Sequence, residues 1–264
     1  MKLNILYEDS HILVCVKPSG VPSQSDKTAD FDMVNRLKNY LYEKGDNKGQ
    51  YYIGVVHRLD RPVSGIMVFA KTPFSASELS KQIQKKEFTK KYLTVVTADL
   101  SNKLGEEKTL LTDYLVKNGR TNLSSITTEK DKNGKKAQLY YTVKKVENGL
   151  SLVEVELLTG RHHQIRVQMK EHLGGVWGDT KYNGDAENIV LTKTTLKNAD
   201  IGNVSMQNKN ENNDENIDNT STGKKAVWKE IALFAYHLEF IHPKTKKKMV
   251  FEQLPEKEPF CSLL

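Results

Sequence analysis

The chain has 264 residues, and its hydrophobic content of 38% is enough for a sizeable core. Lysine and arginine outnumber aspartate and glutamate by 40 to 33, which gives a net charge of +7. Such a charge attracts polyanions and makes nucleic acid the leading partner class, although a lysine excess can also serve solubility alone. The two cysteines give no disulfide framework and no metal-type spacing, and the N-terminal stretch has no apolar run as long as a signal peptide or membrane span. We therefore expect a cytoplasmic protein with no membrane segment.

The first elements in the chain are predicted to be two strands and a helix. The apolar runs NILYED and HILVCVKP meet at polar residues, as in a short hairpin. Apolar residues then recur at helical spacing over 32–45, where Asp32 is a candidate N-cap and Gly45 a candidate stop.

An unusually polar segment follows, HRLDRPVSG at residues 57–65. It lies between the apolar runs GVVH and GIMVFAKT. The second run is too short for a confident helix and rich in the branched and aromatic residues of a buried strand. The polar segment is therefore predicted to be a loop between two strands.

The middle of the chain predicts one helix and then several strands. The helix starts at Pro73 and runs to about residue 87. The predicted strands cover 90–98, 111–117, 137–147 and 150–159. Consecutive strands without intervening helices favour an α+β fold with a mixed, largely antiparallel central sheet and flanking helices.

The last third contains a second well-marked helix, with Thr159 as a possible cap, Gly174 as a stop and apolar residues four apart between them. Residues from about 185 to 225 are poor in apolar side chains toward their end, so we interpret them as a surface insertion in a single domain, 1–264. The final strands are predicted at 231–243 and 248–255.

Unusual polar residues gather in the loop at 57–65 and at the start of the last helix. On an ideal helix Arg161 lies about 40° from the apolar Ile165, whereas Arg166 lies about 100° from it. Arg161 is therefore expected to lean inward, where a guanidinium needs an anion. Asp60 is the proposed partner, since such a pair at about 4 Å gains about 4 kcal/mol at an effective dielectric of about 20. A carboxylate held ionised in this way can act as a nucleophile or a base.

Each of these residues also has a purely structural interpretation. Asp60 is equally explained as a residue that caps its own turn, and Tyr92 as an ordinary sheet aromatic. His162 and His163 lie about 100° apart on a helix and cannot hold one metal ion together. The sequence has no glycine-rich phosphate loop, no zinc-type cysteine pairs and no serine elbow. Nucleotide hydrolysis, zinc-finger binding and hydrolase chemistry therefore have no support.

The order of the motifs resembles that of the RluA-like pseudouridine synthases, and the resemblance covers most of the chain outside the insertion. The pairing of HRLD with TGR and HQIR is its most specific part. The resemblance implies the pseudouridine synthase catalytic fold and an enzyme that isomerises uridine within ribosomal or transfer RNA, with no cofactor and no metal. The matching segments are HRLDRPVSG, KKYLTVV, TGRHHQIRVQM, GDTKYNG and FAYHLEFIHP.

The resemblance also implies roles for individual residues. Asp60 corresponds to the essential catalytic aspartate, and Arg161 to the arginine that pairs with it. Tyr92 corresponds to a tyrosine that stacks on the extruded uracil and assists removal of the proton at carbon 5. Arg58 is expected to enter the gap that the flipped base leaves, offsetting part of the few kcal/mol that extrusion costs.

We expect RNA contacts from the residues around these three catalytic candidates. They are His57, Arg58, Arg61, Lys90, Lys91, His163, Gln164 and Arg166. The small accessory RNA-binding domain of many relatives is not expected before the first strand, so the catalytic domain must supply the contacts itself. We expect a monomer with no obligate protein partner.

Two other functions remain open. One is a non-catalytic RNA-binding or chaperone protein on the same fold, whose binding would not depend on Asp60. The other is a metal-dependent nuclease that uses Asp60 with His57 or His163, which a chelator would inhibit.

Overall fold

The computed structural model describes residues 3–25, 30–45, 51–183 and 230–264. The surface insertion predicted at about 185–225 lies outside the described residues. The strands are β1 Asn4–Glu8, β2 Ile12–Lys17, β3 Gly54–Val55, β4 Ser64–Ala70, β5 Thr89–Val96, β6 Thr109–Asn118, β7 Leu123–Thr127, β8 Lys135–Glu147, β9 Leu150–Leu157, β10 Leu233–Ile241 and β11 Lys248–Glu252. The helices are α1 Met33–Glu43, α2 Pro73–Gln84, α3 Gln164–Leu173, α4 Thr180–Asn183 and α5 Phe260–Leu263, with a 3-10 turn at Ser101–Lys103.

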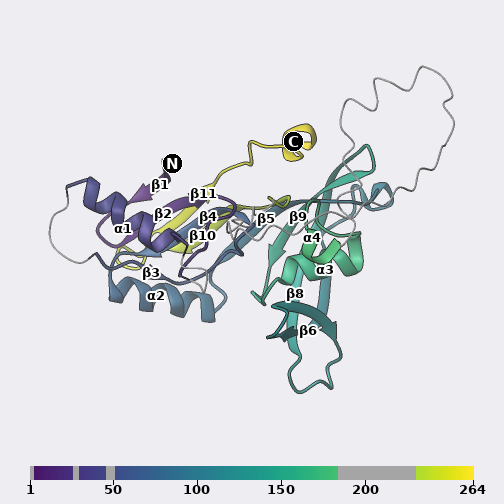
Figure 1. Cartoon of the computed structure of the whole chain (residues 1–264), viewed down its shortest axis with the longest axis horizontal. Helices are drawn as coiled ribbons and strands as arrows, with labels where there is room; N and C mark the ends of the chain where they lie inside the picture. Colours follow the sequence, from purple (N-terminus) through teal and green to yellow (C-terminus); the bar gives the residue numbers. More distant parts are fainter. Residues whose placement is uncertain (1–2, 26–29, 46–50, 184–229) are drawn as a thin grey trace, which may run out of the picture.

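In the described part of the chain, eleven strands form one sheet (Figure 1). Its main order is β1-β2-β4-β10-β5-β9-β8-β6-β7, with β11 beside β10 and β3 beside β4. The pair β4 and β10 is parallel, and the other pairs are antiparallel. The predicted α+β class with a mixed, largely antiparallel sheet is therefore confirmed.

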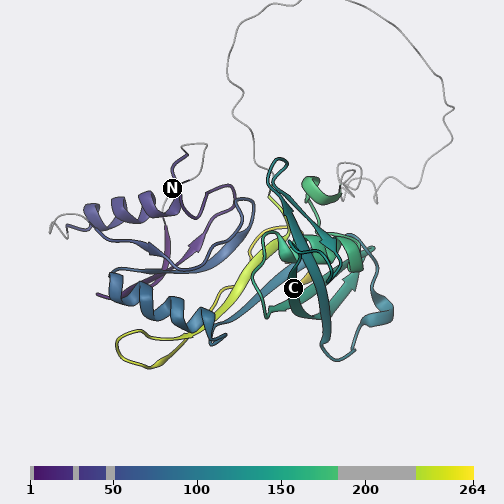
Figure 2. The same cartoon turned by 90° about the horizontal axis from the view of Figure 1, so that it is seen from below.

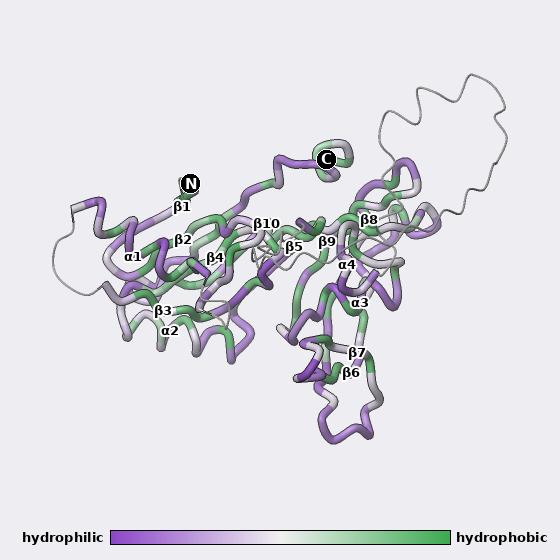
Figure 3. Tube along the Cα trace, in the orientation of Figure 1, coloured by the Kyte–Doolittle hydropathy of each residue, from purple (hydrophilic) through white to green (hydrophobic). Residues whose placement is uncertain are grey.

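Helices α1 and α2 cover opposite faces of the first half of the sheet (Figures 1 and 2). Successive strand residues point to opposite faces, and β2 divides accordingly. Leu13 and Cys15 pack in one core with Leu37 of α1, whereas Ile12 packs in another with Leu79 of α2. Hydrophobic residues accordingly follow the central strands such as β2 and β4 (Figure 3).

Helix α3 covers the second half of the sheet on the same face as α1. Ile165, Met169 and Leu173 of α3 belong to the core that also contains Leu37 of α1. Figure 1 shows α1 and α3 at separate places along the sheet, with β4, β10 and β5 between them. The loop at 57–65 and the start of α3 are thereby brought to one face.

The sheet's two halves join where β4 runs parallel to β10, with Gly65 opposite Ala235. Gly65 has a φ of 128°, a backbone conformation that other residues rarely adopt. A Cβ atom at this position would overlap the backbone nitrogen and oxygen of Ala235. The glycine that closes the motif HRLDRPVSG therefore permits the close approach of β4 and β10.

Most predicted elements form. Of the two helix caps predicted from the sequence, one forms and one does not. Asp32 caps α1 by accepting the N–H of Asn35, as predicted. The predicted cap of α3 is wrong, because the helix begins only after His163, which adopts a left-handed φ of 54°. Thr159 instead accepts the backbone N–H of Gln138 in β8.

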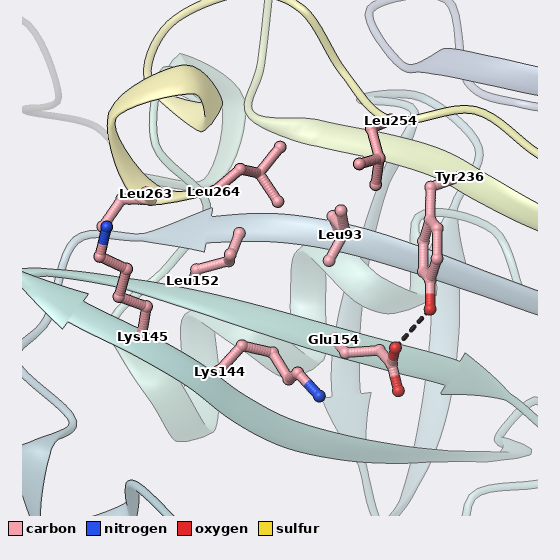
Figure 4. Close-up of a pocket in the computed structure, with 9 residues that line it drawn as sticks. All are labelled: Leu93, Lys144, Lys145, Leu152, Glu154, Tyr236, Leu254, Leu263 and Leu264. Atoms are coloured by element: carbon pink, nitrogen blue, oxygen red, sulfur yellow. Dashed lines mark hydrogen bonds between the residues drawn. The ribbon is translucent and has the colours of Figure 1, made fainter.

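A shallow pocket of about 320 Å³ lies on the face of the sheet away from α3 (Figure 4). Leu93 and Leu152 line it. Along their strands both alternate with residues that pack in the core beneath α3, so they point to the opposite face. The hydroxyl of Tyr236 donates a hydrogen bond to Glu154 at its edge.

None of the helices in the described part of the chain has the length and apolar composition of a membrane span.

Candidate active site

The segment 57–65 lies between β3 and β4, as predicted, with its last two residues already in β4, and residues 17–23 hold it in place. Ser23 clamps Leu59, because its hydroxyl donates to the carbonyl and accepts the N–H of that residue, at 2.8 and 3.1 Å. Ser19 donates to the carbonyl of Pro62 at 2.8 Å. These contacts fix the backbone on both sides of Asp60.

Lys17, the last residue of β2, is fully buried beneath the loop. Its Nζ donates to the carbonyl oxygens of Pro18, Val21 and Arg61 at 2.9, 2.7 and 3.1 Å. Three acceptors match the three N–H groups of an ammonium. Burial lowers the pKa of Lys17 to about 7, and the nearby Asp60 opposes that change.

Asp60 faces a buried arginine of α3. Its Oδ2 lies 3.4 Å from Nη1 of Arg166, and the Asp60 side chain keeps 29% of its surface exposed against 4% for Arg166. The same guanidinium makes two 2.7 Å hydrogen bonds to Asp179, through Nε and Nη2. One cation is thus shared by two carboxylates, and Asp60 is the one that remains open to a ligand.

Burial and the neighbouring cations have opposite effects on the pKa of Asp60. Removal from water raises the pKa of its carboxyl, while the charge and hydrogen bond of Arg166 lower it. The Asp179 carboxylate adds to the rise, and Lys17 opposes it. The balance leaves the pKa above the ordinary aspartate value.

The predicted pair between Arg161 and Asp60 is wrong. Arg161 is exposed, and its Nε donates to the carbonyl of Lys136 at 2.9 Å. The helical projection failed because Arg161 precedes α3, on the other side of the left-handed turn at His163. Arg166, for which we expected RNA contact, is buried, as are all of the first six residues of α3.

Gln164, which was predicted to contact RNA, is buried, and that contact stays a prediction. Its side chain is 3% exposed, and the protein occupies both ends of its amide. Oε1 accepts the N–H of Arg161 at 3.0 Å, and Nε2 donates to the carbonyl of Gln138 at 3.1 Å. Gln164 therefore ties the start of α3 to β8.

His163 is buried beside the acid, with Nε2 at 3.7 Å from Oδ2 of Asp60. Tyr92 of β5 is also buried, at 6% exposure, and lies near Asp60. Burial first, and the charge of Asp60 second, raise the pKa of Tyr92. Its hydroxyl therefore stays protonated at physiological pH.

The other predicted RNA contacts fall into two groups. Arg58 is exposed, and its charge helps to lower the pKa of His162, after burial and other nearby cations. Lys90 and Lys91 are half-buried on β5, where burial lowers the pKa of Lys90 and Lys91 lies 3.9 Å from Glu154.

His57 and Arg61 are instead engaged within the protein. Nε2 of His57 accepts the N–H of Val68 at 3.1 Å, and burial lowers the pKa of His57 to about 3. Arg61 donates to the carbonyl of Gly20 and pairs with Asp30. Contact of either residue with RNA stays a prediction.

Three residues of the site were not identified from the sequence: Lys17, Asp179 and Tyr182. A lysine at the end of an apolar strand, directly before the turn residues PSG, is an available signal for Lys17. Asp179 and Tyr182 belong to GDTKYNG, which shows no chemistry until α4 is placed against α3. Among the residues that the structure describes, no three histidine, cysteine or acidic side chains form a metal-binding group.

The chain is similar to known proteins in both sequence and structure. A sequence model described as RNA pseudouridylate synthase matches residues 11–171, which contain Asp60, Tyr92 and Arg166. The ribosomal large subunit pseudouridine synthase C of Rickettsia bellii is 33% identical over 202 residues, covering 72% of this chain and 64% of that protein. YlyB of Bacillus subtilis, described as an uncharacterized RNA pseudouridine synthase, is 34% identical over 185 residues, covering 69% of this chain and 58% of that protein. This chain therefore matches less than two thirds of the length of either relative.

Solved structures share the fold. The human RNA pseudouridylate synthase domain containing 4 superposes with a TM-score of 0.67 and 19% identity, covering 96% of this chain and 89% of that one. The family model spans more than half of the chain, and the motifs and the fold agree with it. The chain therefore belongs to the RNA pseudouridylate synthase family, in its RluA-like branch.

Proposed function

We propose that this chain converts uridine to pseudouridine within RNA, with Asp60 as the catalytic carboxylate. The observation that carries the proposal is the arrangement around Arg166. This guanidinium is buried and pairs with Asp179, and it also pairs with Asp60, which is more exposed. A carboxylate fixed by a buried cation and open on its other side is suited to act on a bound nucleoside.

The reaction is an isomerisation, so its atoms balance without an oxidant or a reductant. The bond between C1′ and N1 breaks, the base turns, C5 bonds to C1′, and the proton on C5 leaves while N1 gains one. Asp60 contributes either by attack on the sugar or by removal of a sugar proton. Both roles require the ionised carboxylate that Arg166 favours.

The uridine must leave the RNA stack to reach Asp60. Arg58, which is exposed, has a planar guanidinium that can fill the gap left by the base. Tyr92 offers its ring to the extruded uracil, a contact typically worth about 1 to 3 kcal/mol. Since its hydroxyl stays protonated, we assign Tyr92 to stacking and hydrogen bonding, and not to action as a tyrosinate base.

The proposed substrate is a structured RNA of the ribosomal or transfer class. The chain's net charge of +7 supports a polyanionic partner. We propose Arg58, Lys90 and Lys91, which are exposed or half-buried, as phosphate contacts. Weakening of RNA binding by added salt would reflect their share of the affinity.

The test compares Asp60→Asn with wild type. We expect the variant to bind RNA within a few fold of wild type and to release no tritium from RNA that contains 5-tritiated uridine. Asp99→Asn changes an exposed carboxylate that only caps a turn, and should behave as wild type. Undiminished release from Asp60→Asn would overturn the proposal.

The same assay separates the alternatives. A non-catalytic RNA-binding protein would bind RNA without any release by wild type. A metal-dependent nuclease would cleave RNA and stop when a chelator is added.

A further inference from the structure

Beside Asp60 lies a histidine that is hydrogen-bonded to a tyrosine, and this pair has no part in the proposed reaction so far. The hydroxyl of Tyr182 in α4 lies 2.6 Å from Nδ1 of His163. The other ring nitrogen of His163, Nε2, lies 3.7 Å from Oδ2 of Asp60. The imidazole therefore bridges the phenol and the carboxylate.

One end of this arrangement has a fixed direction. The backbone N–H of Ser124 in β7 donates to the Tyr182 oxygen at 2.9 Å, since a backbone N–H can only donate. The phenol oxygen accepts there, and its own proton is free to donate to Nδ1 of His163. When the phenol donates in this way, the histidine proton sits on Nε2 and faces Asp60. The reverse tautomer would turn a bare nitrogen lone pair toward a carboxylate.

We propose that Tyr182 is a positioning residue that holds His163 in the Nε2–H tautomer, so that an uncharged N–H is directed at the Asp60 carboxylate. This inference rests on the proposed function, because it assigns a role to a neighbour of the same acid. A separation of 3.7 Å is longer than a hydrogen bond, and contacts of this kind commonly tighten when substrate binds.

The ring of His163 is held tightly enough to keep this direction. His163 has a left-handed φ of 54°, an uncommon conformation for a residue other than glycine. Its ring stacks on His162 with centroids 3.8 Å apart. His162 is in turn bonded through Nδ1 to the hydroxyl of Ser124 at 2.8 Å, so both histidines are anchored on β7.

The surroundings keep the imidazole uncharged. Burial, followed by the charges around the ring, lowers the pKa of His163 to about 2. A neutral ring can direct an N–H at Asp60 without adding a second cation beside Arg166. The titratable groups around His163 and Asp60 come from every neighbouring element: Lys17, Tyr92, Lys117, His162, Arg166, Asp179, Lys181 and Tyr182.

The consequence is a small shift in the protonation of Asp60. An N–H directed at a carboxylate favours its ionised form and lowers its pKa. Removal of the Tyr182 hydroxyl frees His163 to take either tautomer and weakens this effect. We expect the acid limb of the pH–rate profile of Tyr182→Phe to move up by about 0.5 to 1 pH unit, with catalysis about three- to tenfold slower below it.

The experiment has a spectroscopic readout and a matched control. In ¹⁵N-labelled protein, correlation spectra of the ring should show His163 protonated on Nε2 in wild type and as a tautomer mixture in Tyr182→Phe. Tyr236→Phe also loses a phenol-to-protein hydrogen bond, on the far face of the sheet, and should leave both His163 and the pH–rate profile unchanged. A wild-type tautomer and an unmoved acid limb in Tyr182→Phe would overturn the inference.

A second pair of variants tests the inference in case Tyr182→Phe does not fold. His163→Gln retains an N–H at nearly the same place and should keep more activity than His163→Leu, which has none. Equal activity of these two variants would contradict the inference. Asp60→Asn separates the two proposals: if it stays active the proposed function fails, whereas if it is inactive and Tyr182→Phe is unaltered only the role of Tyr182 fails.

Discussion

Asp60 and Asp179 compete for the guanidinium of Arg166. Asp179 holds it by two hydrogen bonds of 2.7 Å, while Asp60 lies 3.4 Å away. The Asp179 carboxylate also raises the pKa of Asp60 through its own charge. The pKa of Asp60 therefore depends first on burial and then on how the two carboxylates share the guanidinium.

Asp179→Asn should change that division in favour of Asp60. Without the competing carboxylate, the pKa of Asp60 falls, so the ionised form persists to lower pH. We expect the acid limb of single-turnover rates to move to lower pH, together with a loss of stability of about 3 kcal/mol from the broken buried pair. An acid limb that moves to higher pH would contradict this account of the site.

Arg161 and Arg166 offer a direct comparison of two arginines in one motif. Arg166→Lys keeps the charge but loses the planar fork that spans Asp60 and Asp179, and we expect a rate loss of about tenfold or more. Arg161→Lys removes one exposed bond to the Lys136 carbonyl and should stay within about twofold of wild type. Measured tritium-release rates in the opposite order would support the ion pair predicted from the sequence.

Residue types at the site could be predicted, but their partners could not. Asp60 and Tyr92 stand out because their motifs are specific, and the structure brings them together. The choice of Arg161 over Arg166 depended on a helix that starts before residue 161. No local sequence signal predicts that His163 takes a left-handed conformation and delays the start of the helix.

The loop that carries Asp60 depends on the segment at 17–23 for its shape. Lys17 is central to that support, since its three carbonyl acceptors include Arg61 of the loop. An unfolded lysine has a pKa near 10.5, whereas burial lowers that of Lys17 to about 7 in the folded chain. Between these values the unfolded chain holds a proton that the folded chain has released, so this group makes folding more favourable as the pH rises.

Lys17→Met removes this linkage. From pH 7 toward 10 we expect the free energy of unfolding of wild type to rise relative to that of the variant. Wild-type activity should fall over the same range, because a neutral amine has only two N–H groups for three carbonyls. Parallel stability curves, measured by denaturant unfolding at each pH, would show that Lys17 keeps its proton throughout.

Elements with their own local signals were predicted well. Helix α1 has a capping aspartate and a clear apolar period, and it forms as predicted between Asp32 and Gly45. The short strand β7 was missed because Leu123–Thr127 contains few apolar residues and is stabilised by pairing with β6. The parallel pairing of β4 with β10 joins segments about 170 residues apart, and no local pattern encodes it.

At the scale of the whole molecule, the sheet places two separate halves of the chain around one acid. Residues 17–23 and the loop at 57–65 supply Asp60 and its support, and the segment 163–179 supplies His163, Arg166 and Asp179. Both halves pack in one core that continues across the sheet from α1 to α3. The catalytic proposal therefore requires the complete sheet and not the loop alone.

The central claim is that the Asp60 carboxylate makes pseudouridine in cellular RNA. Its most direct test is chemical mapping of pseudouridines in ribosomal and transfer RNA from cells that carry either the wild-type gene or Asp60→Asn at its own locus, with equal protein levels. We predict that at least one pseudouridine present with wild type is absent with the variant. An identical map in both strains, with the same sites lost only when the gene is deleted, would contradict the role of Asp60.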